Sequence, residues 1–445
     1  MSGAGLKHGR RHAGTPGIGL RTQARAARPG YSYGMDFTTA RDLTCGPARR
    51  RERAIREDVM KTWLIALALL LGPAAYAQEP GAQQPAQPPA VQQPPGPPVP
   101  EIPYDSVPNL LKLPPDLYLG EAAGVAVNSK GHIFVFSRGG SSRGPAFANT
   151  AAQLLEFDRD GVFIREIGKN LYAWSFAHTV RVDKDDNIWA TDKGSDMVIK
   201  FNPEGRVEMV FGRKPEASDT EAKPYERTGP PLPHVDGRFR QPTDVTWDRE
   251  GNIFISDGYV NSRIAEYDHN GDWVKSWGER GKGPGQFNLV HTIASDAQGN
   301  IYVGDRNNRR IQVFDHDGNF QREIKINVPF DENAKPVIGN KPDLSTYLQT
   351  GGSFAPGAPW AICITPPPNQ VLYSSDSYPG RIYKLSLDGK VLGVLGKSGK
   401  QLNQFGWIHE MACPSENELY VAEILNWRVQ KLILRADQQR ADVAR

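Results

Sequence analysis

Three histidines, His178, His291 and His409, stand at the same position of three separate repeats in the sequence. Each follows an apolar pair and precedes an alternating strand pattern. Their separations are 291 − 178 = 113 and 409 − 291 = 118 residues, or two repeats each. In a ring of six such repeats these positions fall on alternate units, about 120° apart around one axis, so the three imidazoles would converge. Three histidines with an open fourth position are a typical ligand set for a catalytic zinc ion.

The repeat that must position these histidines is a run of short strands joined by tight turns. Asp-x-x-Gly-Asn between alternating runs is typical of a hairpin, because the turn needs residues with positive φ. A period of about 40 to 60 residues with several short strands predicts an all-β fold, a six-bladed β-propeller of NHL-like repeats. The six copies begin near Ala122, Phe176, Gln241, Leu289, Ala358 and Trp407. The sixth copy ends near Leu434 without an obvious fourth strand, so we expect the N-terminal segment Val107–Leu119 to close the ring.

Composition changes along the chain and predicts five segments. Lys61, the apolar run Trp63–Leu71 and the small-x-small site at Ala75–Ala77 are typical of a secretory signal peptide. Because signal peptides act at a chain start, we interpret the Arg-rich residues before it as a leader from a start codon placed too early; the alternative is a real basic extension ahead of an internal anchor. The expected segments are a leader (1–59), a signal peptide (60–77), a Pro/Gln-rich disordered linker (78–103), the propeller (104–436) and a polar tail (437–445).

Charge and cysteine content limit the class of partner and the compartment. The 445 residues carry a formal net charge of only +3, which is too small to make nucleic acid the expected partner. The apolar run is too short for a membrane span. We therefore expect a periplasmic or secreted monomer with no membrane span after signal cleavage. Cys363 and Cys413 fall in the first strands of the last two blades; an oxidising compartment permits a disulfide, but we favour two buried, unpaired thiols.

Three more side chains are expected on the face that carries the histidines. Arg138 and Arg306 follow the second strands of the first and fourth blades, and Tyr259 follows that of the third. Two guanidinium groups would hold a carboxylate in bidentate fashion. The tyrosine would act as a base if its pKa falls below the usual value of about 10, although a rim aromatic is the alternative. Acidic residues that recur after the second strands, and arginines that recur before the third, are interpreted as ion pairs or caps within the repeats.

In these residues and in several longer motifs, the chain resembles the peptidyl-α-hydroxyglycine α-amidating lyases. The resemblance runs from about Ala122 to Val429 and includes the strings SDGYVNSRI, QPTDV, PGQF and DRNNRRIQVF. It implies a zinc ion on the three histidines, a catalytic tyrosine at Tyr259 and active-site arginines at Arg138 and Arg306. It also implies a structural calcium ion on the channel axis, held by the backbone carbonyls of Val125 and Val180 and by Glu410, where the family has Asp. A second departure is Trp407, where the family has Met.

The implied reaction is zinc-dependent cleavage of the N–C bond of a peptidyl- or acyl-α-hydroxyglycine, a small anionic substrate, to an amide and glyoxylate. This would make the protein a carbon–nitrogen lyase. Two other functions stay open: a non-catalytic NHL propeller that serves as a binding module or scaffold in the cell envelope, and a propeller hydrolase with carboxylate-rich metal ligation. Metal content separates the three, since a zinc ion favours the lyase, calcium alone the hydrolase and no metal the binding module.

Overall fold

The computed structural model describes residues 99–139, 152–215, 233–339, 341–343 and 352–435. The chain divides into two units, Met1–Ala86 and Gln87–Arg445, and every described residue belongs to the second. The expected leader, signal peptide and polar tail, and most of the expected linker, therefore lie outside the described residues. Where the chain is described, no helix has both the length and the apolar composition that crossing a bilayer requires.

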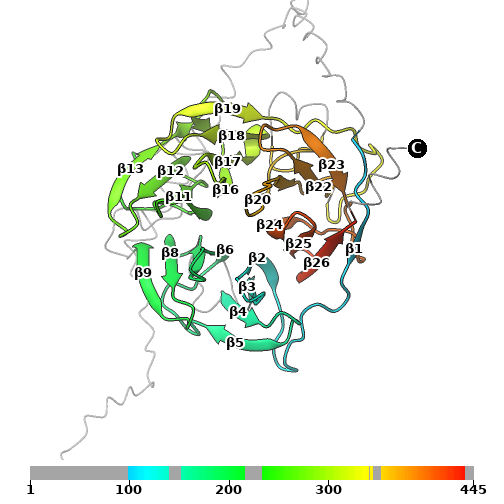
Figure 1. Ribbon diagram of the computed structural model, residues 1–445, viewed down its shortest axis with the longest axis horizontal. Coiled ribbons are helices and arrows are strands. Elements are labelled where there is room, and N and C mark those ends of the chain that lie inside the picture. The colour runs from blue at the N-terminus through cyan, green and yellow to red at the C-terminus, as the bar shows by residue number, and fades with distance from the viewer. Residues whose placement is uncertain (1–98, 140–151, 216–232, 340, 344–351, 436–445) are drawn as a thin grey trace, which may run out of the picture. The chain divides into compact units, whose positions relative to one another are not determined.

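Within the described ranges, six four-stranded antiparallel sheets stand around a central channel, as predicted (Figure 1). In each blade the first strand lies nearest the channel and the last lies on the rim. The first three blades consist of β2 Glu121–Val127, β3 Ile133–Arg138, β4 Gln153–Phe157 and β5 Phe163–Ile167; β6 Ala177–Val182, β7 Ile188–Asp192, β8 Met197–Phe201 and β9 Val207–Gly212; and β10 Asp244–Trp247, β11 Ile253–Asp257, β12 Arg263–Tyr267 and β13 Trp273–Trp277.

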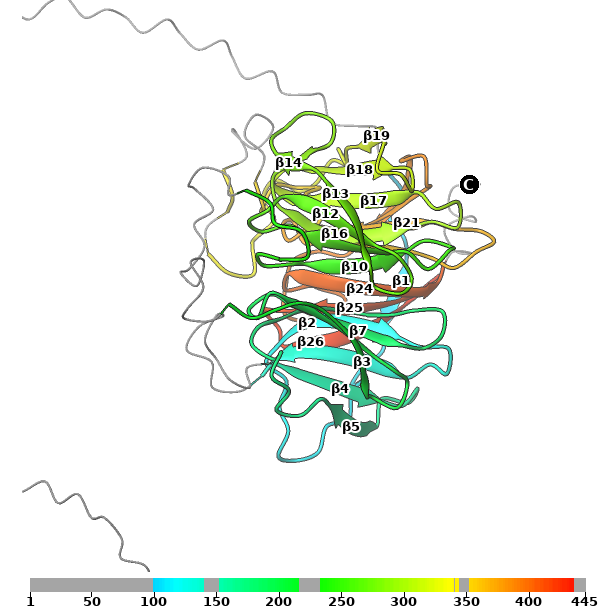
Figure 2. The ribbon, with the colours of Figure 1, turned by 90° about the vertical axis from the view of Figure 1, so that its left-hand side faces the viewer.

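The other three blades continue the same order. They consist of β16 Val290–Ser295, β17 Ile301–Asp305, β18 Arg310–Phe314 and β19 Phe320–Ile324; β20 Ala361–Ile364, β21 Leu372–Ser375, β22 Ile382–Leu385 and β23 Val391–Leu395; and β24 Ile408–Ser415, β25 Glu418–Glu423, β26 Arg428–Leu434 and β1 Tyr104–Ser106. A short parallel pair, β14 Glu279–Arg280 and β15 Gln286–Phe287, and the single-turn helix η1 Arg306–Asn308 lie in the loops. Seen edge-on, the innermost strands β10, β16 and β24 run along the channel (Figure 2).

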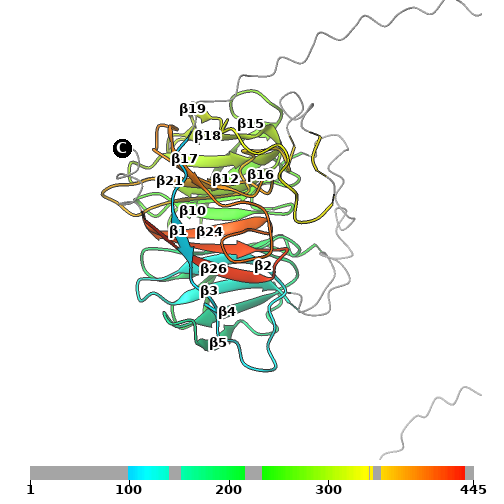
Figure 3. The ribbon, with the colours of Figure 1, turned by 90° about the vertical axis from the view of Figure 1, so that its right-hand side faces the viewer.

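An N-terminal strand closes the ring, as predicted, but it is not the predicted segment. Strand β1 pairs with β26, with Tyr104 opposite Leu434, and lies beside it in Figure 3. The segment Val107–Leu119 follows this strand instead of forming it. Pro108, Pro114 and Pro115 interrupt that segment, and proline cannot donate a hydrogen bond to a sheet.

The hydrophobic core lies between neighbouring blades. Among the described residues six apolar clusters are found, one at each junction between blades. At the first junction Trp174 packs against Phe136 and Phe201, with ring centroids 4.8 and 5.8 Å away. Because blade-to-blade packing holds the ring together, the channel itself is left to polar side chains.

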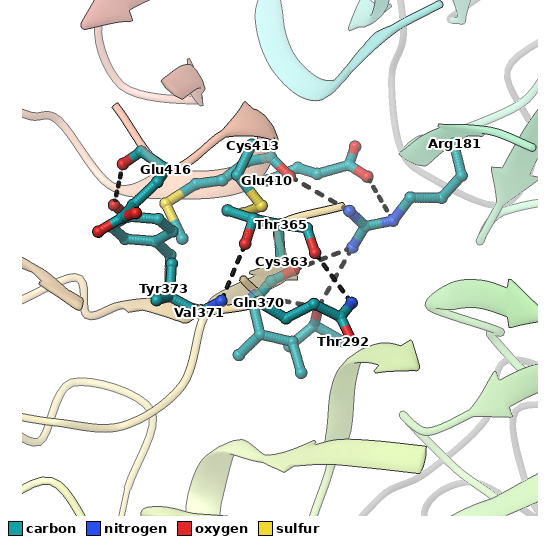
Figure 4. Close-up of a disulfide and its surroundings, with 12 residues drawn as sticks. Arg181, Thr292, Cys363, Thr365, Gln370, Val371, Tyr373, Glu410, Cys413 and Glu416 are labelled. Carbon is teal, nitrogen blue, oxygen red and sulfur yellow. Dashed lines mark hydrogen bonds and ion pairs between the residues drawn. A yellow bond between two sulfur atoms is a disulfide. The ribbon is translucent and has the colours of Figure 1, made fainter. Parts of the chain in front are cut away.

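Cys363 on β20 and Cys413 on β24 form a disulfide, with their Cα atoms 6.1 Å apart (Figure 4). Our expectation of two unpaired thiols was therefore wrong. The bond links the innermost strands of the last two blades, which are brought together by ring packing and not by closeness in sequence. It lies beyond the histidines along β24 and lines a cavity of about 300 Å³ together with Arg181.

Acidic residues at the ends of the second strands form ion pairs within the third, fourth and sixth blades, as predicted. Ion pairs of 2.7 to 3.1 Å join them to arginines at the third strands, and their remaining oxygens accept backbone N–H groups from the loop before the first strand. The ion pairs are Asp257–Arg263, Asp305–Arg310 and Glu423–Arg428. In the second blade Asp192 accepts from the N–H groups of Ser175 (2.8 Å) and Phe176 (3.0 Å). These contacts fix the start of each innermost strand, where the histidines lie.

Candidate metal centre and active site

The three histidines converge at one end of the channel. Each occupies a β-bulge at the start of an innermost strand, on β6, β16 and β24, where the pairing register shifts. A bulge re-aims the side chain that it carries, which here directs the imidazoles inward. All three are buried, and one ligand atom from each lies within 4.8 Å of the others. We refer to His178, His291 and His409 as the three-histidine centre.

Backbone carbonyls from the intervening blades fix the orientation of each ring. The Nδ1 atom of His178 lies 2.6 Å from the carbonyl of Thr243, that of His291 lies 2.6 Å from Trp360, and that of His409 lies 2.8 Å from Ala123; these contacts are made across blade junctions. A carbonyl only accepts, so each Nδ1 must carry the proton and donate it. Each Nε2 is therefore left with its lone pair, the form that binds a metal ion.

The protonation state of the centre also suits a metal ion. Burial, followed by nearby positive charges, holds the pKa of all three histidines well below the ordinary value, so the rings are neutral at pH 7. Metal ligation requires neutral imidazole. In addition, Nε2 of His291 is buried without a hydrogen-bond partner, as expected of an atom that serves as a ligand. The residues present thus fit a zinc ion with three nitrogen ligands and an open position.

Arg138 reaches the centre from the end of β3. Its Nη2 lies 3.3 Å from Nε2 of His409, while Nε donates to the carbonyl of Ala177 at 2.8 Å. Its Nη1 pairs with Glu121 at 2.7 Å, and the guanidinium stacks on Phe176, 4.1 Å from the ring centroid. These contacts hold one edge of the guanidinium in place and direct the other toward the histidines.

Tyr259 and Arg306 lie on the same face, as predicted. The hydroxyl of Tyr259 is 3.4 Å from Nε2 of His178. Arg306 stacks on Trp360, 4.4 Å from the ring centroid, and hydrogen-bonds the phenol of Tyr259. The structure therefore gathers Arg138, Tyr259 and Arg306 around the three-histidine centre, each from a different blade.

Lys193 was not among the predicted residues, yet it belongs to this group. Its Nζ lies 4.0 Å from the ring centroid of Tyr259. Burial alone would raise the pKa of Tyr259, but Lys193, Arg306 and Arg138 outweigh burial and lower that pKa to about 8. A signal for Lys193 was present in the sequence. Lys193 directly follows Asp192 at the end of a second strand, and it therefore holds the repeat position that Arg138 and Arg306 hold in their blades.

An aromatic wall of Phe354, Trp360 and Trp407 borders the centre on the side of the last two blades. The ring centroids of the wall lie 5.0 to 5.9 Å apart, and Trp360 lies 5.6 Å from His291. Phe354 is 42% exposed, so the wall is open to a ligand. The aromatic wall meets the cationic group where Arg306 stacks on Trp360.

The residues expected to hold calcium do not fit that ion. Val125 and Val180 both donate their N–H groups to Oε2 of Glu410 at 3.0 Å. The other carboxylate oxygen of Glu410 lies 3.1 Å from Nε of Arg181. Calcium takes six to eight oxygen ligands, whereas here the expected carboxylate ligand Glu410 is already held by two backbone N–H groups and lies beside a guanidinium.

Comparison with known proteins agrees with the propeller fold and finds lyases among the similar proteins. A family model described as a 6-bladed beta-propeller matches residues 238–338. Peptidyl-glycine alpha-amidating monooxygenase A of Xenopus laevis is 31% identical over 335 residues, which cover 69% of this chain and 31% of that protein. A probable peptidyl-alpha-hydroxyglycine alpha-amidating lyase of Caenorhabditis elegans is 26% identical over 313 residues, 61% of this chain and 84% of that protein. NHL repeat-containing protein 3 of Mus musculus is 30% identical over 218 residues, 45% of this chain and 54% of that protein.

The fold and these relatives define an all-β, six-bladed propeller of NHL-type repeats. Within that class, the relatives of the chain include peptidyl-α-hydroxyglycine α-amidating lyases, in agreement with the sequence motifs. The chain spans about a third of the length of the vertebrate monooxygenases that it matches.

Proposed function

We propose that the protein is a zinc-dependent lyase that cleaves a peptidyl- or acyl-α-hydroxyglycine to an amide and glyoxylate. The observation that carries the proposal is the convergence of three Nε2 lone pairs, each oriented by a backbone carbonyl of the neighbouring blade. Relatives that are named as lyases of this kind support the choice of substrate. A zinc ion held by His178, His291 and His409 would supply a Lewis acid beside the reacting hydroxyl.

Tyr259 is the proposed base. The substrate R-CO-NH-CH(OH)-COO⁻ is converted to the amide R-CO-NH₂ and to glyoxylate, OHC-COO⁻. The phenolate of Tyr259 takes the hydroxyl proton while the C=O bond forms and the N–C bond breaks. The electron pair of that bond goes to the amide nitrogen, which takes back the proton, so the reaction consumes no acid or base overall. A phenol with a pKa of about 8 is well suited to both transfers near neutral pH.

The cationic side of the centre is proposed to bind the carboxylate. Arg138 is held by Glu121 and Ala177 with its Nη2 directed at the centre, so it can bind a carboxylate without reorganising. Arg306 hydrogen-bonds Tyr259 and is therefore assigned to the base more than to the substrate. Lys193 adds positive charge beside both, which favours an anionic substrate.

The aromatic wall is proposed to receive the acyl part of the substrate. Trp360, Phe354 and Trp407 offer adjoining aromatic surfaces. A benzoyl or phenylalanyl group would bury its ring against these faces, where stacked pairs contribute about 0.5–1.5 kcal/mol beyond area burial. An N-benzoyl-α-hydroxyglycine is therefore a suitable test substrate.

The proposal extends to compartment and partners. We propose a periplasmic or secreted monomer that acts on a small anionic α-hydroxy amide, with no nucleic-acid partner. The disulfide between Cys363 and Cys413 supports an oxidising compartment.

Glyoxylate release tests the function. Purified protein loaded with zinc should release glyoxylate from N-benzoyl-α-hydroxyglycine faster than the spontaneous breakdown measured in the same buffer. His409→Ala should lose both bound zinc and activity while it keeps its strand content, because packing between blades holds the ring. A zinc-loaded protein that never exceeds the spontaneous rate would remove the substrate assignment. Full zinc retention in His178→Ala, His291→Ala and His409→Ala would remove the metal centre.

A non-catalytic propeller is the alternative, and the match to NHL repeat-containing protein 3 favours it. On that alternative the face with Arg138, Lys193 and Arg306 would bind an anionic partner without turnover. Purified protein without stoichiometric zinc and without glyoxylate release would favour the binding module.

A further inference from the structure

Arg181 extends from β6 into the channel below the three-histidine centre and contacts several blades at once (Figure 4). It forms a bidentate pair with Asp244 of the third blade, in which Nε donates to Oδ1 at 2.9 Å and Nη2 donates to Oδ2 at 2.6 Å. Its Nη1 donates to the carbonyl of Met411 at 3.2 Å and its Nη2 to that of Ile362 at 3.3 Å. One guanidinium of the second blade thus links the third, fifth and sixth.

The two carboxylates around Arg181 extend the same network to the remaining blades. Asp244 also accepts from the hydroxyl of Thr292 at 3.0 Å and from the N–H of Ile293 at 3.1 Å, both on the fourth blade. Glu410 accepts from the N–H of Val125 on the first blade. The side chain of Glu410 fits because Gly124 has none: a Cβ there would lie 2.6 Å from its Oε2. All six blades therefore meet in one polar cluster centred on one fixed positive charge.

This cluster resembles a metal-binding site in which an arginine side chain takes the place of the bound cation. Two carboxylates and two backbone carbonyls surround the guanidinium, and these are the ligand types that a hard divalent ion would take. Asp244 and Glu410 are buried, with at most 1% of each exposed. Two buried carboxylates favour a positive charge between them, since an unpaired buried charge is strongly destabilising. Arg181 supplies one positive charge, which lies within 3.1 Å of both carboxylates.

We propose that Arg181 is a built-in structural cation that ties the six blades together at the channel axis, so that the ring needs no calcium ion there. An always-charged guanidinium suits this role, because it presents five donors in a planar fork to oxygens on several sides. Removal of the guanidinium would leave a cluster of oxygen atoms that a divalent cation can occupy. The inference concerns stability at the axis and does not depend on the proposed lyase activity.

Calcium content and thermal unfolding of the full chain test the proposal. Samples are treated with EGTA, dialysed and re-supplied with zinc, so that only calcium differs. The native protein should hold no stoichiometric calcium, and millimolar CaCl₂ should leave its Tm unchanged. Arg181→Ala should lower the Tm by on the order of 10 °C, and CaCl₂, but not KCl at equal ionic strength, should restore part of that loss.

Two further variants make the test specific. Arg181→Lys keeps a positive charge but loses the bidentate fork, so its Tm should fall less and respond little to calcium. The control is Arg165→Ala. Arg165 lies on the outer strand β5 and pairs with Glu156 of β4, and its removal should produce no calcium response. About one calcium ion per native chain with a Tm that falls after EGTA would overturn the proposal. An Arg181→Ala protein as stable as the native one would overturn it too. If Arg181→Ala fails to fold, calcium content and EGTA response of the native protein decide.

Discussion

Each imidazole of the three-histidine centre depends on a residue that offers only its backbone. Thr243, Trp360 and Ala123 occupy, in the odd-numbered blades, the position that histidine occupies in the even-numbered ones. Convergence of the histidines was predictable from repeat spacing, because equivalent positions in a ring must face one axis. The three backbone carbonyls that accept from the histidines could not be predicted, since every residue type has a carbonyl. Six equivalent positions thus divide into three histidines and three residues whose carbonyls orient them.

Tyr259→Phe isolates the proposed base. The variant should keep its zinc and its Tm but lose turnover by about 10²–10⁴-fold, the usual contribution of a general base. The ring itself stays, so contacts to Lys193 and the histidine rings are preserved. Glyoxylate release at saturating substrate, with zinc measured on the same sample, checks this expectation. Undiminished turnover would exclude Tyr259 as the base.

Lys193 should set the pH at which Tyr259 becomes effective. The base must be ionised, so turnover should rise with pH and level off above the pKa of the phenol, which the cationic side chains alone lower to about 8. Lys193→Met removes the first of the three cations that lower this pKa, so the rise should move to higher pH. On the acid side of the rise, turnover should then fall about tenfold for each pH unit by which the midpoint moves. Lys193→Arg, which keeps the charge, is the matched control. A bound metal ion would lower the midpoints of the native protein and of Lys193→Met alike and would not hide the difference between them. An unchanged midpoint in Lys193→Met would contradict the assignment.

At the scale of the element, β-bulges and turns decide which side chains face the centre. The hairpin turns were evident in the sequence: Asp248 accepts from the N–H of Asn252 at 2.8 Å, and Gly251 adopts a φ of 88°. The closing strand was misplaced by a few residues, because a strand of three residues, Tyr104–Ser106, carries little pattern of its own. The reach of Arg181 across the channel depends on how blades are spaced, which no local pattern records.

The disulfide between β20 and β24 is expected to stabilise the junction of the last two blades. It closes a loop of 50 residues, for which chain entropy predicts up to about 4 kcal/mol. Cys363→Ser should lower the free energy of unfolding by at most that amount and leave zinc content unchanged, since Cys363 lies apart from the histidines. Denaturant unfolding of the variant and of the native protein, each with and without reductant, measures the difference. Reductant should weaken the native protein but not the variant; an equal response of both would show that the bond does not act this way.

At the scale of the whole molecule, the described fold is a ring that the residues before β2 complete. A chain shortened to begin at Gln78 should keep the Tm, zinc content and activity of the complete chain. A chain that begins at Val107 loses Ile102 from the last junction and the partner of β26, which exposes a strand edge. It should unfold at lower temperature and aggregate. Thermal unfolding and light scattering of the two shortened chains make the comparison, and equal stability would show that β1 is dispensable.

Mass spectrometry of the exported native protein tests the predicted processing. The mature N-terminus should lie near Gln78, because the signal peptide is expected to end at Ala77. Recovery of an intact Met1 on mature protein would contradict the interpretation of residues 1–77.

The hydrogen bond from His409 to the carbonyl of Ala123 joins the last blade to the first. A growing chain has His178, His291 and their acceptors Thr243 and Trp360 before His409 is synthesised, but His409 gains its acceptor only when the ends of the ring meet. A zinc ion bound by all three histidines, as proposed, would therefore be acquired only after the ring has closed. If the chain is exported unfolded, as proposed, the supply of zinc that matters is the one outside the compartment where the protein is made.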